Sequence, residues 1–161
     1  MYNFIFDSDA LIKLAYSGAL AKVCEIFECS TTIEVKREVI DEGKKRFYPD
    51  AELIEEIVEK DLLKIKEFKK KTETTRRLGC GELSVWQLSK VIKNSVIVSD
   101  DQSFLNELEK EKINFLVPVD LIILLKRLKK INLAEANQYL EGIKVFIRIE
   151  EYNKAKKEIG G

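Results

Sequence analysis

Histidine is absent from the 161-residue sequence. Without it, the chain has no Ser-His or Cys-His catalytic pair and no imidazole to act as a general base. Carboxylates, lysine or a metal-activated water must therefore carry any proton transfer that the protein performs. We expect an enzymatic activity of this chain to depend on acidic residues or on a bound metal.

Cysteine is scarce, and the three present are Cys24, Cys29 and Cys80. An odd number of cysteines with no secretory leader indicates free thiols and not a disulfide framework. Cys24 and Cys29 are five residues apart and have no histidine to complete a zinc site. We therefore expect neither a disulfide scaffold nor a zinc centre.

Long apolar runs are also missing. The longest, LVPVDLIILL, is interrupted by Pro118 and Asp120 and is too short to cross a bilayer. No lysine-rich start with a small-residue cleavage site precedes an early apolar run. We therefore expect a soluble, cytoplasmic protein that has no membrane partner.

Neither sign of charge dominates, since the formal net charge is zero. This balance alone gives no indication of nucleic-acid binding. Residues 1–60 carry 8 basic against 13 acidic side chains, and the remainder carries 20 against 15. An acidic centre beside a basic surface would suit a polyanionic substrate, although two halves of opposite sign also arise by chance.

Strand-like and helix-like segments alternate along the chain. The patterns predict strands at 2–6, 28–32, 62–68, 95–99 and 114–117, and helices at 9–18, 19–27, 33–42, 50–60, 82–93 and 102–112, with further helices over 120–161. Ser8 or Asp9 is expected to cap the first helix, and Gly43 to end the third. Alternation of this kind predicts one α/β domain over residues 1–161. We expect a three-layer α/β/α sandwich with a central parallel sheet of four or five strands.

Acidic residues stand where a predicted strand or a glycine-rich turn leads into a helix. Asp7 follows YNFIF, Asp100 and Asp101 follow VIVS, and Glu82 follows the glycines of GCGE. Because strand ends of one sense meet at one crevice of a parallel sheet, we expect these carboxylates to converge. Their mutual repulsion is expected to raise at least one pKa. Acids in such a cluster persist as ligands of a hard cation, Mg²⁺ or Mn²⁺, which indicates metal-dependent phosphate chemistry.

Each acid also has a simpler structural explanation. Asp7 can belong to a helix cap, and Glu82 can complement the dipole at the start of its helix. Glu38 shares its helix face with other acids, which is typical of a solvated stripe. One of Asp100 and Asp101 is expected to cap the following helix while the other faces the pocket.

Four segments in order resemble the PIN-domain ribonucleases, which include the VapC-like toxins of toxin–antitoxin pairs. The segments are IFDSDALIKL, EVKREVIDEG, LGCGELSVWQL and VIVSDDQSFL, and the resemblance runs from Tyr2 to about Val119. It implies a Rossmann-like α/β/α fold with an acidic pocket that binds Mg²⁺ or Mn²⁺ and cleaves RNA. Two such ions can activate a water and stabilise the leaving oxygen.

The resemblance assigns roles position by position. The implied catalytic and metal-binding acids are Asp7, Glu38, Glu82 and Asp101, with Asp100 as a second metal-binding candidate and Ser99 as the supporting hydroxyl. Asp9 stands where the family usually has a small hydroxyl or amide. This fifth acid either strengthens metal binding or caps the helix.

Substrate and partners are less specific in the sequence. Arg76 and Arg77 precede the Gly-Glu turn and are candidates to hold a substrate phosphate, although an exposed arginine pair is often only solvated. A toxin role would imply a cognate antitoxin. The aliphatic helix VDLIILLKRLKK is either a core helix or part of a homodimer face.

Two other classes of function remain open. The DSD motif also resembles the DxD of haloacid-dehalogenase-like phosphatases, but Leu11 stands where that family has a threonine. In that fold Glu38 and Glu82 would have no role. A non-catalytic PIN-like module that binds RNA or scaffolds a complex is the other alternative, and the presence of all four acids speaks against it.

Overall fold

A computed structural model describes residues 1–67 and 78–160 of the protein. In this part of the chain, one sheet contains five strands, all parallel, in the order β3–β2–β1–β4–β5. The strands are β1 (Asn3–Phe6), β2 (Glu28–Thr32), β3 (Leu63–Lys66), β4 (Ser95–Val98) and β5 (Phe115–Leu116). The prediction of a parallel sheet of four or five strands is confirmed.

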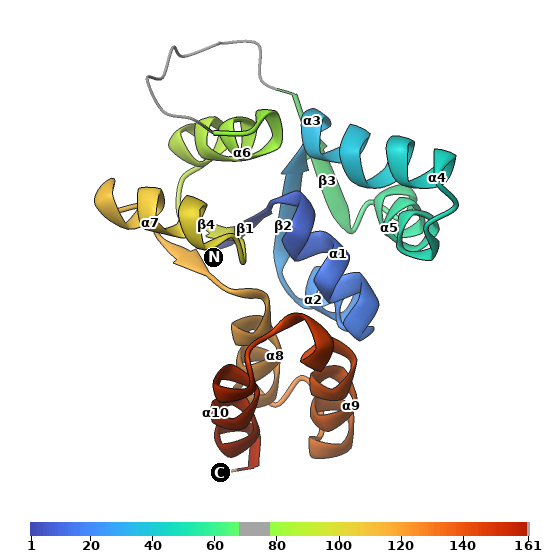
Figure 1. The fold of residues 1–161 in the computed structure, drawn as a ribbon, viewed down its shortest axis with the longest axis vertical. Helices are drawn as coiled ribbons and strands as arrows, with labels where there is room; N and C mark the ends of the chain where they lie inside the picture. The colour runs from blue at the N-terminus through green and yellow to red at the C-terminus, as the bar shows by residue number, and fades with distance from the viewer. Residues whose placement is uncertain (68–77, 161) are drawn as a thin grey trace.

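Helices cover both faces of the sheet. They are α1 (Ser8–Ser17), α2 (Leu20–Ile26), α3 (Ile33–Lys36), the π-helix η1 (Arg37–Glu42), α4 (Gly43–Lys45), α5 (Pro49–Glu59), α6 (Cys80–Val91), α7 (Gln102–Lys110), α8 (Pro118–Arg127), α9 (Leu133–Ile143), the 3₁₀ turn η2 (Lys144–Phe146) and α10 (Ile149–Gly160). Figure 1 shows α6 and α7 on one side of the strands and α1, α2 and α5 on the other, with α8, α9 and α10 grouped below. This is the predicted three-layer α/β/α sandwich.

The order of the strands fixes where a site can form. From β1 the chain moves outward to β2 and β3, then returns to the other side of β1 for β4 and β5. Because the connections diverge between β1 and β4, a crevice opens at the carboxyl ends of these two strands. Phe6 and Val98 are paired there, so the residues that follow them emerge side by side.

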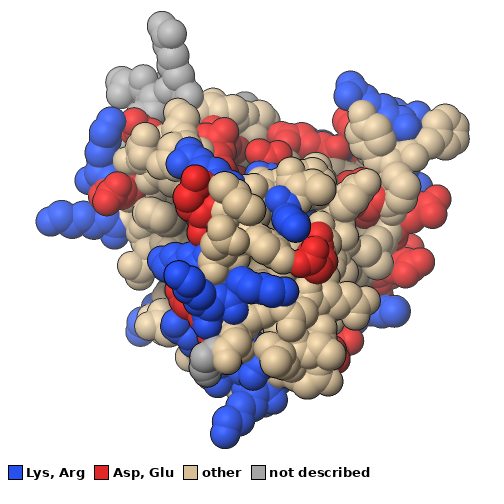
Figure 2. Space-filling view, turned by 60° about the horizontal axis from the view of Figure 1, so that its bottom comes forward, with Lys and Arg blue, Asp and Glu red and all other residues tan. Residues whose placement is uncertain are grey.

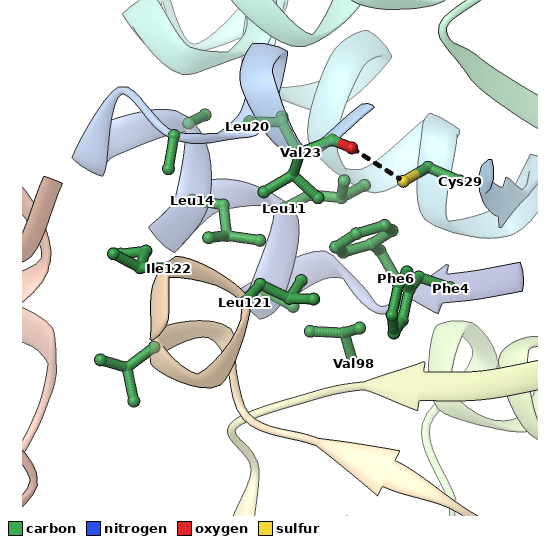
Figure 3. Close-up of a cluster of buried hydrophobic side chains, with 14 of the residues drawn as sticks. Phe4, Phe6, Leu11, Leu14, Leu20, Val23, Cys29, Val98, Leu121 and Ile122 are labelled. Atoms are coloured by element: carbon green, nitrogen blue, oxygen red, sulfur yellow. Dashed lines mark hydrogen bonds between the residues drawn. The ribbon is translucent and has the colours of Figure 1, made fainter. Parts of the chain in front are cut away.

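One hydrophobic core joins the sheet to the C-terminal helices. Figure 3 shows Leu121 and Ile122 of α8 packed toward Leu11 and Leu14 of α1, with Val98 of β4 close by. All five side chains are buried. Helix α8 is therefore a core helix, as the first of the two explanations of its aliphatic sequence predicted.

The prediction that Gly43 ends the third helix was wrong. The backbone of Gly43 is right-handed helical, and the helical stretch continues as α4 to Lys45. A Cβ at Gly43 would lie 2.9 Å from the Cβ of Ala51 in α5. This glycine therefore allows two helices to approach closely, a requirement that the sequence pattern of one helix does not reveal.

The molecular surface carries both signs of charge. Figure 2 shows a face on which Lys and Arg side chains gather near the centre, with Asp and Glu side chains among and around them. Within the described residues no helix is both long and apolar enough to cross a bilayer. The three cysteines are free, with Cys24 and Cys29 buried and Cys80 exposed.

Candidate functional site

A cavity of about 230 Å³ opens at the carboxyl ends of β1 and β4. Its lining residues, called the acidic pocket below, are Asp7, Ser8, Asp9, Glu38, Gly79, Cys80, Gly81 and Glu82. They come from the start of α1, from η1 and from the start of α6. Four of the described lining residues are carboxylates and none is Lys or Arg, so the pocket presents a concentrated negative charge.

Asp7 lines the acidic pocket and is buried. It is the N-cap of α1, because its Oδ1 accepts a hydrogen bond of 2.9 Å from the backbone N–H of Ala10. Its Oδ2 accepts a hydrogen bond from the hydroxyl of Ser99, which follows β4. The prediction that Ser8 or Asp9 caps this helix was wrong, since the acid directly after the strand fills that position itself.

Burial raises the pKa of Asp7 to about 7. The hydrogen bonds from Ser99 and Ala10 lower this pKa, and the charges of Asp9 and Glu82 raise it by smaller amounts. The predicted rise of a pKa is therefore present, but its main cause is burial and not repulsion between acids. An ion bound beside Asp7 would relieve both effects.

Glu38 reaches the acidic pocket from a π-helical turn. Its Oε2 accepts a hydrogen bond from the hydroxyl of Ser8, the residue after Asp7. A Cβ at Gly81 would lie 2.7 Å from the Glu38 Oε1, so the absence of a side chain at Gly81 leaves room for this carboxylate. π-helical turns often occur at functional sites. Glu38 is thus directed into the pocket and is not only part of a solvated stripe.

Glu82 both complements the start of its helix and faces the acidic pocket, while its catalytic role stays a prediction. It lies in the first turn of α6, where its Oε2 accepts a 3.3 Å hydrogen bond from the backbone N–H of Gly79. It also lines the acidic pocket. Burial is the largest cause that raises the pKa of Glu82, and nearby acids, Asp101 first among them, raise it further. The first turn of α6 therefore holds this carboxylate beside the other acids.

The two neighbouring aspartates after β4 have different surroundings. Asp101 is the N-cap of α7 and accepts a 2.8 Å hydrogen bond from the backbone N–H of Phe104. Its negative charge raises the pKa of Glu82. Asp100 instead forms a 2.6 Å ion pair with Lys13 of α1. The expectation that one caps while the other faces the pocket was wrong, because Asp101 is both the cap and the acid whose charge raises the pKa of Glu82, while Asp100 pairs with Lys13.

The Lys13–Asp100 pair joins the two elements that carry Asp7 and Asp101. Both side chains are largely buried, at 19% and 15% exposed. We expect Lys13→Met and Asp100→Asn each to lower the free energy of unfolding by about 1–2 kcal/mol, because each leaves a partly buried charge unpaired. The double variant should cost less than the sum, as measured by urea unfolding.

A matched control for this pair is the surface contact between Lys22 and Glu25. These side chains are 3.7 Å apart and 33% and 51% exposed. Lys22→Met should change the free energy of unfolding by less than about 0.5 kcal/mol. Additive losses at Lys13 and Asp100 would contradict a coupling between α1 and the turn after β4.

A set of hydroxyls that the sequence reasoning missed supports the acidic pocket. Thr32 caps α3 and its hydroxyl lies 2.7 Å from that of Ser84 in α6. Ser84 donates a 2.7 Å hydrogen bond to the carbonyl of Gly81. The end of β2 is thereby fastened to the turn that carries Glu82. Ser8 was missed in the same way, because contacts across 30 or more residues leave no periodic signal in the sequence.

The donor set of the acidic pocket suits a hard divalent cation, since every charged lining group is a carboxylate. Within the described residues, no group of three His, Cys, Asp or Glu side chains is arranged to hold one ion as the structure stands. Both oxygens of Asp7 and one oxygen of Glu38 accept protein hydrogen bonds. Metal binding would therefore require these carboxylates to turn toward a shared ion.

Arg76 and Arg77, the candidates for contacts to a substrate phosphate, lie outside the described residues. Asp9 lines the acidic pocket and is exposed, while Asp7 and not Asp9 caps the helix. The capping role considered for Asp9 is therefore excluded, and its part in metal binding stays a prediction.

Comparison with known proteins identifies the family and the fold. The model of the family DUF3368, described as a PIN domain, matches residues 3–160. Among solved structures, the fold is similar to a PilT N-terminus domain protein, SSO1118, from the hyperthermophilic archaeon Sulfolobus solfataricus P2. The TM-score is 0.53 at 13% identity, over 74% of this chain and 89% of that one. No curated protein matches the sequence. The family match covers nearly all of the chain, which therefore belongs to the PIN-domain family.

Proposed function

We propose that the protein is a divalent-metal-dependent endoribonuclease that hydrolyses RNA phosphodiester bonds in the acidic pocket. PIN domains are generally nucleases and typically use divalent metal ions. The observation that carries the proposal is the convergence of Asp7, Glu38 and Glu82 on one pocket at the carboxyl ends of β1 and β4. The charge of Asp101 raises the pKa of Glu82, one of these three acids.

The residues of the chain have separable tasks in this proposal. Asp7, Glu38, Glu82 and Asp101 would hold Mg²⁺ or Mn²⁺, and the bound ions would supply an activated water and stabilise the leaving oxygen. Ser99 orients the Asp7 carboxylate, and two helix caps fix where Asp7 and Asp101 point. Since no Lys or Arg is among the described lining residues, an RNA phosphate would be repelled unless cations neutralise the carboxylates.

A finer proposal is that the protein is the toxin of a toxin–antitoxin pair in the cytoplasm, with a cognate antitoxin as partner. Its support is the likeness of four sequence motifs to the VapC-like toxins. When the protein is purified from its native cells, we expect a small protein that inhibits RNA cleavage to copurify with it.

The proposed function is tested with labelled single-stranded RNA, single-stranded DNA and a generic phosphomonoester, each with Mn²⁺, Mg²⁺ or Ca²⁺. We expect cleavage of RNA with Mn²⁺ or Mg²⁺, loss of cleavage with EDTA, and poor cleavage with Ca²⁺ because its looser coordination positions the water badly. Asp7→Asn is the inactive control. Turnover of the phosphomonoester without RNA cleavage would favour a phosphatase. Binding of metal and RNA with no cleavage would favour a non-catalytic module.

A further inference from the structure

An aromatic and basic segment projects from the protein at the end of α4, before α5 begins. This segment, called the 44–48 tip, consists of Lys44, Lys45, Arg46, Phe47 and Tyr48. Figure 1 shows it at the outer edge of the molecule, beyond α4. In Figure 2 a protrusion of blue and tan atoms stands out at the same edge. The tip is not part of the acidic pocket, and the proposed chemistry makes no use of it.

The backbone of Phe47 has a conformation that favours glycine. Its φ is +60°, directly after the last turn of α4. The N–H of Phe47 donates to the Lys44 carbonyl at 3.1 Å, and the N–H of Tyr48 donates to the Gly43 carbonyl at 2.9 Å. This is the helix-ending arrangement in which glycine, or sometimes asparagine, usually occupies the left-handed position. A phenylalanine there is strained.

The ring of Phe47 does not compensate for this strain by packing, because the residue is 91% exposed. The other non-glycine residues with positive φ in the described chain are all polar: Asp61, Asn94, Lys112 and Lys129. Phe47 alone among them exposes an apolar ring. Neither backbone preference nor burial explains this residue, so a contact with another molecule is the remaining reason for a ring here.

The neighbours of Phe47 indicate what that molecule is. Lys44 and Lys45 are held by Glu55 and Glu42, at 2.8 and 3.3 Å. The guanidinium of Arg46 has no such partner among the described ion pairs and hydrogen bonds. Tyr48 is 48% exposed and adds a second aromatic face. An exposed ring beside a planar cation is the chemistry that binds an unpaired base and its phosphate.

The position of the tip also fits a strand that runs to the acidic pocket. The helical stretch that carries Glu38 continues through η1 and α4 and ends at Lys45, two residues before Phe47. From Glu38 to Lys45 the stretch advances seven residues, about 10 Å at roughly 1.5 Å each, which is close to three stacked nucleotides at about 3.4 Å each. Val39 and Ile40 are buried, and Gly43 lies against Ala51, so the stretch is fixed to the core.

We propose that the 44–48 tip binds an unpaired stretch of the RNA substrate a few nucleotides from the scissile bond. Phe47 stacks on one base, and Arg46 contacts the adjoining phosphate. This inference rests on the proposed ribonuclease function, because it assigns a second contact to the same substrate. A protein partner or a second copy of the chain at this tip is the competing explanation.

The main test is Phe47→Gly in an Asp7→Asn background, which prevents cleavage during the measurement. Glycine suits the left-handed backbone, so the melting temperature should stay the same or rise. Affinity for a fluorescently labelled, mixed-sequence single-stranded oligoribonucleotide, read by anisotropy, should fall about tenfold. Phe47→Trp should keep the affinity, and its fluorescence should be quenched when the RNA is added, against a constant contribution from the buried Trp86.

Asp61→Gly is the matched control. Asp61 is exposed, has φ +58° and ends α5 with the same pair of backbone hydrogen bonds, to Val58 at 2.9 Å and from Leu62 to Ile57 at 3.2 Å. Asp61→Gly should likewise leave the melting temperature unchanged or raise it, and it should leave the affinity for RNA unchanged. Unchanged RNA affinity in Phe47→Gly, in a protein whose parent cleaves RNA, would overturn this inference and leave the proposed function standing.

The remaining outcomes are also distinct. A parent protein that neither binds nor cleaves RNA would overturn the proposed function, and the inference with it. A change of oligomeric state in Phe47→Gly at constant RNA affinity would overturn the RNA inference in favour of a protein contact. If Phe47→Gly failed to fold, Phe47→Trp would decide the matter, since unquenched fluorescence in the presence of saturating RNA contradicts stacking.

Discussion

Asp7→Asn should make the metal-free protein more stable at pH 8 and should leave it nearly unchanged near pH 4. The asparagine keeps the cap on Ala10, because its side-chain oxygen accepts the same hydrogen bond. What it removes is a buried negative charge. With the pKa of Asp7 raised from 3.8 to about 7, the gain at pH 8 is on the order of 4 kcal/mol. For a chain of this length that corresponds to roughly 10 °C in melting temperature.

The sign follows from proton binding. A carboxyl whose pKa is higher in the folded state binds its proton more tightly when folded. Its contribution to stability is full below the unfolded pKa of 3.8, declines as the pH rises, and is lost above about 7. Wild type should therefore lose stability between pH 4 and 7 relative to Asp7→Asn. Urea unfolding in EDTA at several pH values measures the difference.

Asp120→Asn is the control for a general effect of buried acids. Burial also raises the pKa of Asp120, which lies in the first turn of α8 and accepts from the N–H of Val117. Mn²⁺ should raise the melting temperature of wild type and of Asp120→Asn alike, since Asp120 lies outside the acidic pocket. It should raise that of Asp7→Asn much less. Equal gains in all three proteins would contradict metal binding at Asp7.

The positions of the strand ends could be predicted from the sequence because they depend on short segments of neighbouring residues. Short apolar runs such as YNFIF and VIVS end in acids, and parallel pairing of β1 with β4 then brings Asp7 next to Ser99. The position of Glu82 on the same pocket was predicted instead from its place after the glycines of GCGE, at the start of a helix. The order of elements and the parallel sheet were predicted from the alternation alone.

Other features depend on contacts between distant elements, and no local pattern encodes them. The ion pair of Asp100 with Lys13 joins positions 87 residues apart, and only the fold shows that it turns Asp100 away from the acidic pocket. The π-helical turn that carries Glu38 is likewise invisible in an amphipathic pattern. The role of Gly43 belongs to a helix crossing, and the same holds for the room that Gly81 leaves for Glu38.

Glu82→Gln, Asp101→Asn and Glu38→Gln should each reduce RNA cleavage by at least about a hundredfold, while any two together should cost little more than one. The amides are chosen because they keep the helix caps at Glu82 and Asp101, so that the protein stays folded. Losses of this kind do not add, because carboxylates that share bound ions act as a unit and the first change already disables it. Single-turnover cleavage with saturating Mn²⁺ measures the effect.

Asp100→Asn provides the sharpest comparison for this series. It lies next to Asp101 on the same turn, yet its carboxylate faces Lys13. Below its melting temperature this variant should keep cleavage within a few-fold of wild type, while Asp101→Asn loses it. Equal losses at the two positions would show that the turn as a whole matters more than which carboxylate faces Glu82. Losses that multiply in the double variants would instead mean that the acids act independently, and a shared metal centre would then be the wrong account of the pocket.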